Sequence, residues 1–234
     1  VPAPRPAAVV VLAAGEGTRM RSATPKVLHR LAGRTMLGHA LAAAAALAPE
    51  HLVVVVRHGR ELVAAHVAEV APAAVLADQD DVPGTGRAVQ AAMGVLEDSL
   101  SGPVVVMAGD IPLLDAGALA ELVAAHVADR NAVTVLTTQV ADPTGYGRIL
   151  REPGTGDVLG IVEHRDATAE ERAITEINSS VYVFDAAVLR AGLGRLGRDN
   201  AQGELYLTDV LALAPAHGAA ARAALGQVKK PYSQ

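Results

Sequence analysis

Residues 9–20 read VVVLAAGEGTRM, an apolar run that ends in a glycine-rich turn. Residues 9–13 are apolar without interruption, which is typical of a strand that helices cover on both faces. Gly15 and Gly17 follow, and glycines let backbone N–H groups approach an anion closely. Open α/β sheets bind ligands at the carboxyl ends of their strands, where this turn would lie. The stretch predicts an α/β fold with a phosphate-binding loop, although an ordinary strand-to-helix turn fits the glycines alone equally well.

Apolar runs and longer Ala/Leu-rich stretches alternate from this point to about residue 140. The alternation predicts a Rossmann-like, mostly parallel sheet flanked by helices, with right-handed crossovers. Strands are expected at residues 9–13, 52–56, 73–77, 104–108 and 133–140. Helices are expected at residues 35–47, 60–70, 85–96 and 116–128.

The pattern changes after about residue 141, where the strand-like pieces become shorter and Gly and Pro interrupt them. Three such strand-like pieces are expected at residues 142–149, 157–164 and 176–185. Two helices are expected at 186–196 and 203–214, and a tail at 215–234. The tail is expected to be a frayed helix with a loose end. We therefore expect a nucleotide-binding half at about residues 8–140 and a smaller β-rich half at 141–214, joined in one compact unit.

Composition excludes several classes of protein. The chain has 234 residues, 51 % of them hydrophobic and 19 % charged, which is the balance of a globular protein. A net charge of −5, four Tyr, one Phe and no Trp offer neither the basic surface nor the stacking faces that nucleic-acid binding needs. No apolar run reaches the roughly 20 residues of a membrane span, so no membrane partner is expected. The absence of Cys excludes disulfides and zinc thiolate sites and suits a cytoplasmic location.

Two cations follow the glycine-rich turn. Arg19 can add a bidentate phosphate contact, and Lys26 comes seven residues later. Pro25 fixes its own backbone φ angle, so the backbone that leads into Lys26 has little conformational freedom. The Walker pattern is excluded because it needs Gly-Lys-Ser/Thr, and a dinucleotide fingerprint is excluded because Met20 replaces its third glycine.

Two polar residues follow expected strands at the same sheet edge. Asp110 ends the run VVVMAGD, where its carboxylate can hold Mg²⁺ together with phosphate oxygens and water. A helix N-cap is the alternative role for such an Asp. Gln79 carries a neutral amide, which can both donate to and accept from one nucleobase edge, although alone it fits an ordinary surface loop.

The run LAAGEGTRMRS at residues 12–22, followed by Pro25-Lys26, resembles the opening signature of the sugar-1-phosphate nucleotidyltransferases, L-x-x-G-x-G-T-R-M and then P-K. Within this family it is most similar to the N-terminal uridylyltransferase domain of the bacterial bifunctional uridylyltransferase/acetyltransferases. The resemblance spans about residues 8–214. It implies a nucleotide-diphospho-sugar transferase fold and a Mg²⁺-dependent reaction in which UTP and N-acetylglucosamine 1-phosphate give UDP-N-acetylglucosamine and pyrophosphate.

The resemblance also implies roles for single residues of the nucleotide-binding half. Arg19, Lys26 and Asp110 would be catalytic, and Asp110 would bind Mg²⁺. Gln79 and the Gly84 backbone would read uracil, while Thr85 would lie near the diphosphate and sugar. The remaining nucleotide contacts would come from Leu12, Ala13, Ala14, Gly15, Ala108 and Gly109.

The β-rich half would bind the sugar. DPTGYGRI at residues 142–149 resembles a family motif whose second glycine, Gly147, contacts the sugar through its backbone. Glu163 and Asn178 match positions that bond the sugar hydroxyls and the N-acetyl group. The run NAQGELYLTD at residues 200–209 also matches the family, and we interpret it as structural support for the sugar pocket. Its NAQGE stretch favours the N-acetylglucosamine branch.

The chain departs from the family pattern at several points. Pro83 replaces Leu, Arg87 replaces His, and Ala108 replaces an aromatic residue or Ser. The family's G-V-N-N motif, which holds a second Mg²⁺ ligand, does not occur in these 234 residues. We also expect no β-helix acetyltransferase domain, through which full-length relatives would oligomerise, within this stretch. Two alternatives follow: a nucleotidyltransferase for another sugar 1-phosphate or nucleotide, or a nucleotide-sugar-binding domain of low activity.

Overall fold

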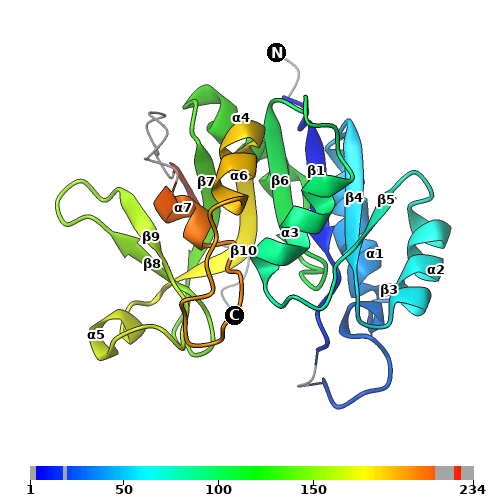
Figure 1. Ribbon diagram of the computed structural model, residues 1–234, viewed down its shortest axis with the longest axis horizontal. Coiled ribbons are helices and arrows are strands. Elements are labelled where there is room, and N and C mark those ends of the chain that lie inside the picture. The colour runs from blue at the N-terminus through cyan, green and yellow to red at the C-terminus, as the bar shows by residue number, and fades with distance from the viewer. Residues whose placement is uncertain (1–3, 18–19, 214–223, 228–234) are drawn as a thin grey trace.

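The computed structural model describes residues 4–17, 20–213 and 224–227. A twisted sheet runs through the molecule with helices on both faces (Figure 1). Its main path has the order β11-β7-β10-β6-β1-β4-β5. The strands are β1 (Ala8–Leu12), β4 (His51–Val56), β5 (Val75–Asp78), β6 (Pro103–Ala108), β7 (Val133–Gln139), β10 (Glu176–Asp185) and β11 (Ala224–Gln227). Only β10 runs antiparallel to its neighbours on this path, which confirms the expected mostly parallel α/β sheet.

Two apolar cores lie on opposite faces of the sheet. One core packs against α1 (Met36–Ala46), α2 (Arg60–Val70) and α4 (Ala116–Ala128). The other packs against α3 (Thr85–Gly94), α6 (Ala186–Leu193) and α7 (Asp209–Leu213). Along β1, Val9 and Val11 belong to the first core and Val10 to the second. This double burial explains why the strand is apolar at every position rather than at every second one.

Short polar side chains cap the first turns of α1 and α4. The Thr35 hydroxyl accepts a hydrogen bond from Gly38 N at the start of α1 (2.9 Å), and Asp115 accepts one from Ala118 N at the start of α4 (2.9 Å). Each bond satisfies a backbone donor that the first helical turn leaves free. The expected helices at 60–70 and 116–128 are confirmed with the same bounds.

A hairpin of β8 (Arg148–Arg151) and β9 (Val158–Val162) extends from the sheet, with α5 (Ala169–Arg172) beside it (Figure 1). Strand β10 pairs with β8 at its beginning and then lies between β6 and β7. The main sheet is therefore continuous across the change of pattern near residue 140. Three short elements follow the glycine-rich turn and were not expected: η2 (Lys26–Leu28), β2 (Arg30–Leu31) and β3 (Arg34–Thr35).

Two expectations for the C-terminal part are wrong. Residues 203–208 are not helical, and α7 covers only Asp209–Leu213, because the backbone of Leu205 pairs with Pro83 and Gly86 instead of continuing a helix. The tail is not a frayed helix at 224–227, where β11 pairs in parallel with the edge of β7. An unpaired strand edge offers backbone groups that such a segment can satisfy. Ala214 and the other tail residues lie outside the described part.

Within the described residues, no helix is both long enough and apolar enough to span a membrane.

A buried histidine joins α4 to β7. His126 is 4 % exposed, and its Nδ1 lies 2.9 Å from the hydroxyl oxygen of Thr134. Burial lowers the pKa of His126 to about 4, against the weaker opposing effect of Asp185. In the unfolded chain the pKa returns to about 6.5.

We expect His126 to make the fold sensitive to acid between pH 6.5 and 4. In this window the unfolded chain binds a proton that the folded chain does not, so stability falls as the pH falls, by up to about 3 kcal/mol. Below pH 4 this contribution changes no further. Urea unfolding of the parent and of His126→Gln at pH 7, 5 and 4 measures it. The difference between the two proteins should change across the window, and a constant difference would contradict the assignment.

Candidate functional site

The loops after several parallel strands meet at one edge of the sheet. The loop after β1 is fixed at two points, since Ala13 N donates to Val55 O (2.9 Å) and Gly109 N donates to Leu12 O (2.8 Å). Gln79 N donates in turn to Val56 O (3.0 Å). The structure therefore brings together the expected nucleotide-binding residues of three loops: Leu12, Ala13, Ala14 and Gly15, then Gln79, Gly84 and Thr85, and finally Ala108, Gly109 and Asp110. Arg19 lies outside the described residues.

Lys26 and Asp110 form an ion pair at this edge. Their side chains are 40 % and 26 % exposed, so both charges face solvent in part. Lys26 begins η2 directly after the buried Pro25, whose restricted backbone angle limits the freedom of the chain at this point. Gly17 packs against it so closely that a Cβ there would lie 2.5 Å from the Lys26 Cβ, and its φ of +62° also favours glycine. The glycine-rich turn thus helps to position the lysine.

The loop from Gln79 to Gly84 is braced from within. Gln79 Nε2 donates to Val82 O (2.9 Å), so part of its amide already holds the loop. Arg87 forms two hydrogen bonds to the carboxylate of Asp80 (2.9 and 2.5 Å), and this guanidinium lowers the pKa of Asp80 to about 2. The positive charge that Arg87 introduces is therefore balanced by the adjacent carboxylate of Asp80.

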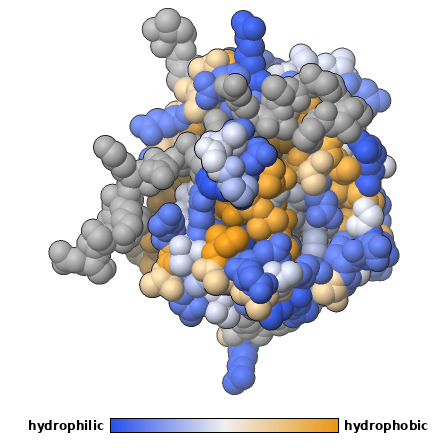
Figure 2. Space-filling model, turned by 90° about the vertical axis from the view of Figure 1, so that its left-hand side faces the viewer, coloured by the Kyte–Doolittle hydropathy of each residue, from blue (hydrophilic) through white to orange (hydrophobic). Residues whose placement is uncertain are grey.

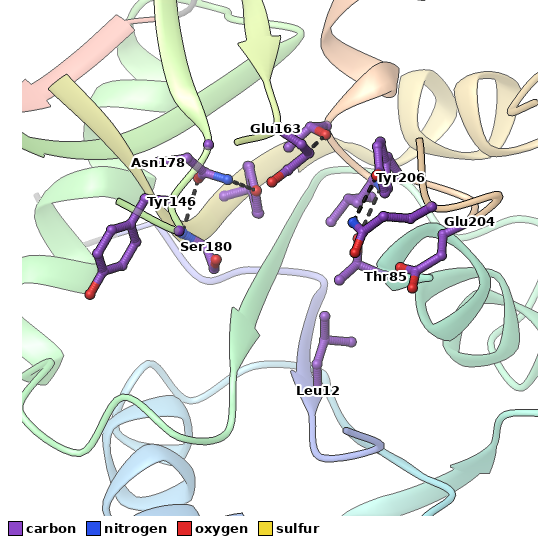
Figure 3. Close-up of a pocket in the computed structure, with 14 residues that line it drawn as sticks. Leu12, Thr85, Tyr146, Glu163, Asn178, Ser180, Glu204 and Tyr206 are labelled. Carbon is purple, nitrogen blue, oxygen red and sulfur yellow. Dashed lines mark hydrogen bonds between the residues drawn. The ribbon is translucent and has the colours of Figure 1, made fainter. Parts of the chain in front are cut away.

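A pocket of about 240 Å³ opens between the loops that follow β1 and β5 and the β8–β9 hairpin (Figure 3). Five expected site residues line it: Leu12, Thr85, Gly147, Glu163 and Asn178. In Figure 3 the labelled side chains of Glu163, Asn178, Tyr206 and Thr85 surround a common space. Other polar residues also line it, from the turn before β8, from β10 and from residues 202–208: Tyr146, Ser180, Tyr182, Gln202, Glu204, Tyr206 and Thr208. None of them was predicted as a ligand-binding residue. The motifs at 142–149 and 200–209 contain five of them, but the sequence does not show which of their side chains face the pocket.

Glu163 carries the partly buried carboxylate of this pocket. The Thr208 hydroxyl donates a hydrogen bond to Glu163 Oε1 (3.3 Å). Burial raises the pKa of Glu163, and the nearby carboxylates of Asp166, Asp209 and Glu204 raise it further, although the bond from Thr208 opposes them. This carboxylate is thus set to accept hydrogen bonds from a polar neutral ligand.

Asn178 is only 6 % exposed and serves the fold as well as the pocket. Its Nδ2 donates to the Tyr182 hydroxyl (2.6 Å), and its Oδ1 accepts from Ser180 N (3.0 Å). These bonds span the position at which the register of β10 against β7 shifts, where Ser180 has a φ of +63°. Asn178 therefore stabilises a β-bulge that bends β10 beside the pocket.

A buried arginine supports the neighbouring turn. Arg148 is 1 % exposed and donates to the carbonyl of Tyr146 and to that of Arg172 (3.4 Å). Its third partner is His164 Nδ1 at 3.3 Å. No carboxylate pairs with this guanidinium in the part of the chain that the structure describes, so carbonyl dipoles stabilise its charge and fix the turn at Gly147.

Gly84 packs against a segment that is distant in sequence. A Cβ at Gly84 would lie 2.5 Å from Leu205 N and closer still to Leu205 O, and φ at Gly84 is +117°. Leu207 N donates to the Thr85 hydroxyl oxygen (3.1 Å), which leaves that hydroxyl proton free to bond a ligand. Glycine at position 84 is therefore required by the protein backbone itself.

Metal-ligating side chains are sparse in the described ranges. No three or more of His, Asp and Glu there lie close enough together to hold a metal ion. The carboxylate of Asp110 can contribute one oxygen ligand. A divalent cation at this edge would take its other ligands from a bound anion and from water.

We expect Gly84→Ala to destabilise the protein by at least about 2 kcal/mol more than Gly154→Ala. Both glycines have positive φ, +117° and +98°, but a Cβ at Gly154 would meet no atom within 4 Å in the described structure. The difference in the free energy of unfolding, measured by urea titration, isolates the contact with Leu205. Equal losses in the two variants would show that the contact is not as tight as described.

The chain is similar in sequence to a known domain family and to named bacterial proteins. The model of the MobA-like NTP transferase domain matches residues 9–178. The proteins named bifunctional protein GlmU are 63 % identical to it in Kineococcus radiotolerans and 58 % identical in Streptomyces coelicolor, over 91 % and 89 % of this chain. The chain spans 43 % of the length of each of these relatives.

Two solved structures share the fold. The crystal structure of UDP-glucose pyrophosphorylase complexed with UDP-glucose has a TM-score of 0.70 and 16 % identity, covering 90 % of this chain and 88 % of that one. The inositol-1-phosphate CTP transferase from T. maritima has a TM-score of 0.71 and 18 % identity, covering 95 % and 85 %. At these identities the likeness establishes the mixed α/β architecture with its flanking helices.

Proposed function

Because this chain belongs to the family of MobA-like NTP transferase domains, we propose that it transfers a uridylyl group from UTP to N-acetylglucosamine 1-phosphate. Family membership makes it a nucleotidyltransferase, and its similarity to the GlmU proteins supports a sugar phosphate as the acceptor. One observation carries the proposal: a polar pocket adjoins the same sheet edge as the Lys26–Asp110 pair. We assign residues 8–140 to nucleotide binding and 141–214 to sugar binding, within one domain of residues 1–214.

The nucleotide would bind along the carboxyl edge of β1, β5 and β6. The amide oxygen of Gln79 and the Gly84 backbone would bond uracil, and the loop of Leu12 to Gly15 would follow the phosphates. Lys26, together with Arg19, would neutralise charge on the triphosphate. The ion pair keeps Lys26 at the edge before substrate arrives, so little reorganisation is needed.

The donor set fits one Mg²⁺ ion, since a carboxylate, phosphate oxygens and water satisfy its preference for oxygen ligands. Asp110 would hold the ion, which when bound supplies positive charge beside the phosphates. Lys26 would then exchange its contact with Asp110 for one with a phosphate oxygen.

The acceptor would occupy the pocket of Figure 3, with Glu163 and Asn178 bonding its hydroxyl and N-acetyl groups and Gly147 closing the wall. A phosphate oxygen of the sugar phosphate attacks the α-phosphorus of UTP, and the bond to the β-phosphate oxygen breaks. The products are UDP-N-acetylglucosamine and pyrophosphate. The protein contributes positioning and charge neutralisation, so no side-chain nucleophile is needed.

A pyrophosphate-release assay tests the substrates. We expect the highest kcat/KM with UTP and N-acetylglucosamine 1-phosphate in the presence of Mg²⁺, and lower values when glucose 1-phosphate or CTP replaces one substrate. A higher value for another pair would favour the alternative of a different nucleotidyltransferase. Calorimetric binding of UDP-N-acetylglucosamine without turnover of any pair would favour a binding domain of low activity.

Removing the Lys26 side chain should lower kcat by roughly a hundredfold, the effect of losing one charge that stabilises the transition state. Arg30→Ala is the matched control, because Arg30 is an exposed cation four residues away whose guanidinium bonds only Gly33 O in the described structure. Circular dichroism of Lys26→Ala checks its fold. A folded variant with the parental kcat would exclude Lys26 from the reaction.

A further inference from the structure

Residues 200–208, the bridging segment, lie across one side of the pocket (orange in Figure 1). Toward the nucleotide loop, the backbone of Leu205 forms two hydrogen bonds, from its N–H to Pro83 O (3.1 Å) and from Gly86 N–H to its carbonyl (2.8 Å). Leu207 N adds the bond to Thr85. Toward the sugar side, Thr208 donates to Glu163. One short segment thus contacts proposed ligand-binding residues of both halves.

The bridging segment is tied to the loop between β9 and α5 by one carboxylate. Asp166 Oδ1 accepts from Ala201 N (2.7 Å), and Asp166 Oδ2 accepts from the Tyr206 hydroxyl (3.2 Å). The direction of the second bond is fixed, because Gln202 Nε2 donates to the Tyr206 oxygen (2.7 Å) and leaves the phenolic proton for Asp166.

The rest of the bridging segment is braced internally. Asn200 Oδ1 accepts from Gln202 N and from Glu204 N (both 3.2 Å), and Asn200 Nδ2 donates to Glu204 O (2.7 Å). The Tyr206 ring is buried, at 7 % exposure. Because the segment is braced in this way, its two hydrogen bonds to Asp166 also help to fix the positions of Leu207 and Thr208 at its other end.

We propose that Asp166 is a positioning residue for the reaction, which acts by anchoring the bridging segment and thereby holding Thr85 and Glu163 at a fixed separation. Asp166 is not among the residues that line the pocket. Its effect passes through Ala201 and Tyr206 to Leu207 and Thr208. The inference rests on the proposed function, because it assumes that Thr85 serves the nucleotide and Glu163 the sugar.

Steady-state kinetics of Asp166→Ala, Tyr206→Phe and the double variant test this role, with UTP and N-acetylglucosamine 1-phosphate varied in turn. Losing hydrogen bonds to a charged group should raise both KM values by about three- to tenfold in Asp166→Ala. The double variant should be no worse than Asp166→Ala, because the Tyr206 hydroxyl acts through that carboxylate. Asp166→Asn, which keeps an acceptor for Ala201 N, should restore part of the loss.

Asp157→Ala is the control, since Asp157 is exposed in the β8–β9 turn and its carboxylate makes no hydrogen bond to a described residue. Unchanged KM values in Asp166→Ala would overturn the proposal. So would a fall in kcat alone, because partial unfolding reduces the active fraction without moving KM. If Asp166→Ala does not fold, Tyr206→Phe decides by the same criterion.

A different result would contradict the proposed function: the parent protein would not turn over the two substrates. The same variants are then compared by calorimetric titration with UTP alone. Weaker binding in Asp166→Ala than in Asp157→Ala supports the anchor, and equal binding overturns it.

Discussion

The central strands must be covered on both faces, and this constraint determines where the site can form. Val9, Val10 and Val11 of β1 have no exposed surface, so each neighbouring strand is reached through a helix that packs on one face or the other. Such crossovers keep the strands parallel and place their following loops at one edge. The Lys26–Asp110 pair and the Gln79 loop lie together for this reason.

Figure 2 shows the molecule from the side of the hairpin, where apolar side chains line a hollow between polar rims.

The polar pocket depends on a departure from that parallel pattern. Strand β10 enters antiparallel between β6 and β7 after pairing with β8. Its bulge, braced by Asn178 against Tyr182 and Ser180, bends the strand beside Glu163. Burial around Glu163 and the neighbouring carboxylates favours hydrogen bonding to neutral groups over further negative charge, which is suited to a sugar ring.

Much of this could be predicted from the sequence where one physical signal dominates. Uninterrupted apolar runs predicted the order of strands and helices. The positions of Lys26, Gln79 and Asp110 relative to the expected strands predicted that these residues lie at one edge of the sheet. The helix expected at 203–214 begins only at Asp209, because Leu205 pairs with Pro83 and Gly86, and local periodicity carries no information on such distant backbone bonds. The buried charge of Arg148 and the hydroxyls of Tyr182 and Tyr206 were missed for the same reason: their partners are set by tertiary packing.

The close approach of Gly84 to Leu205 has a consequence for protein engineering. Thr85 and Leu207 are 122 residues apart in sequence, yet the segments around them fit with no room for a methyl group at position 84. A designer who transplants the Gln79–Thr85 loop from a homologue would import a surface shaped for a different counterpart. The two stretches behave as a single exchangeable module, so a chimera should inherit both from one parent.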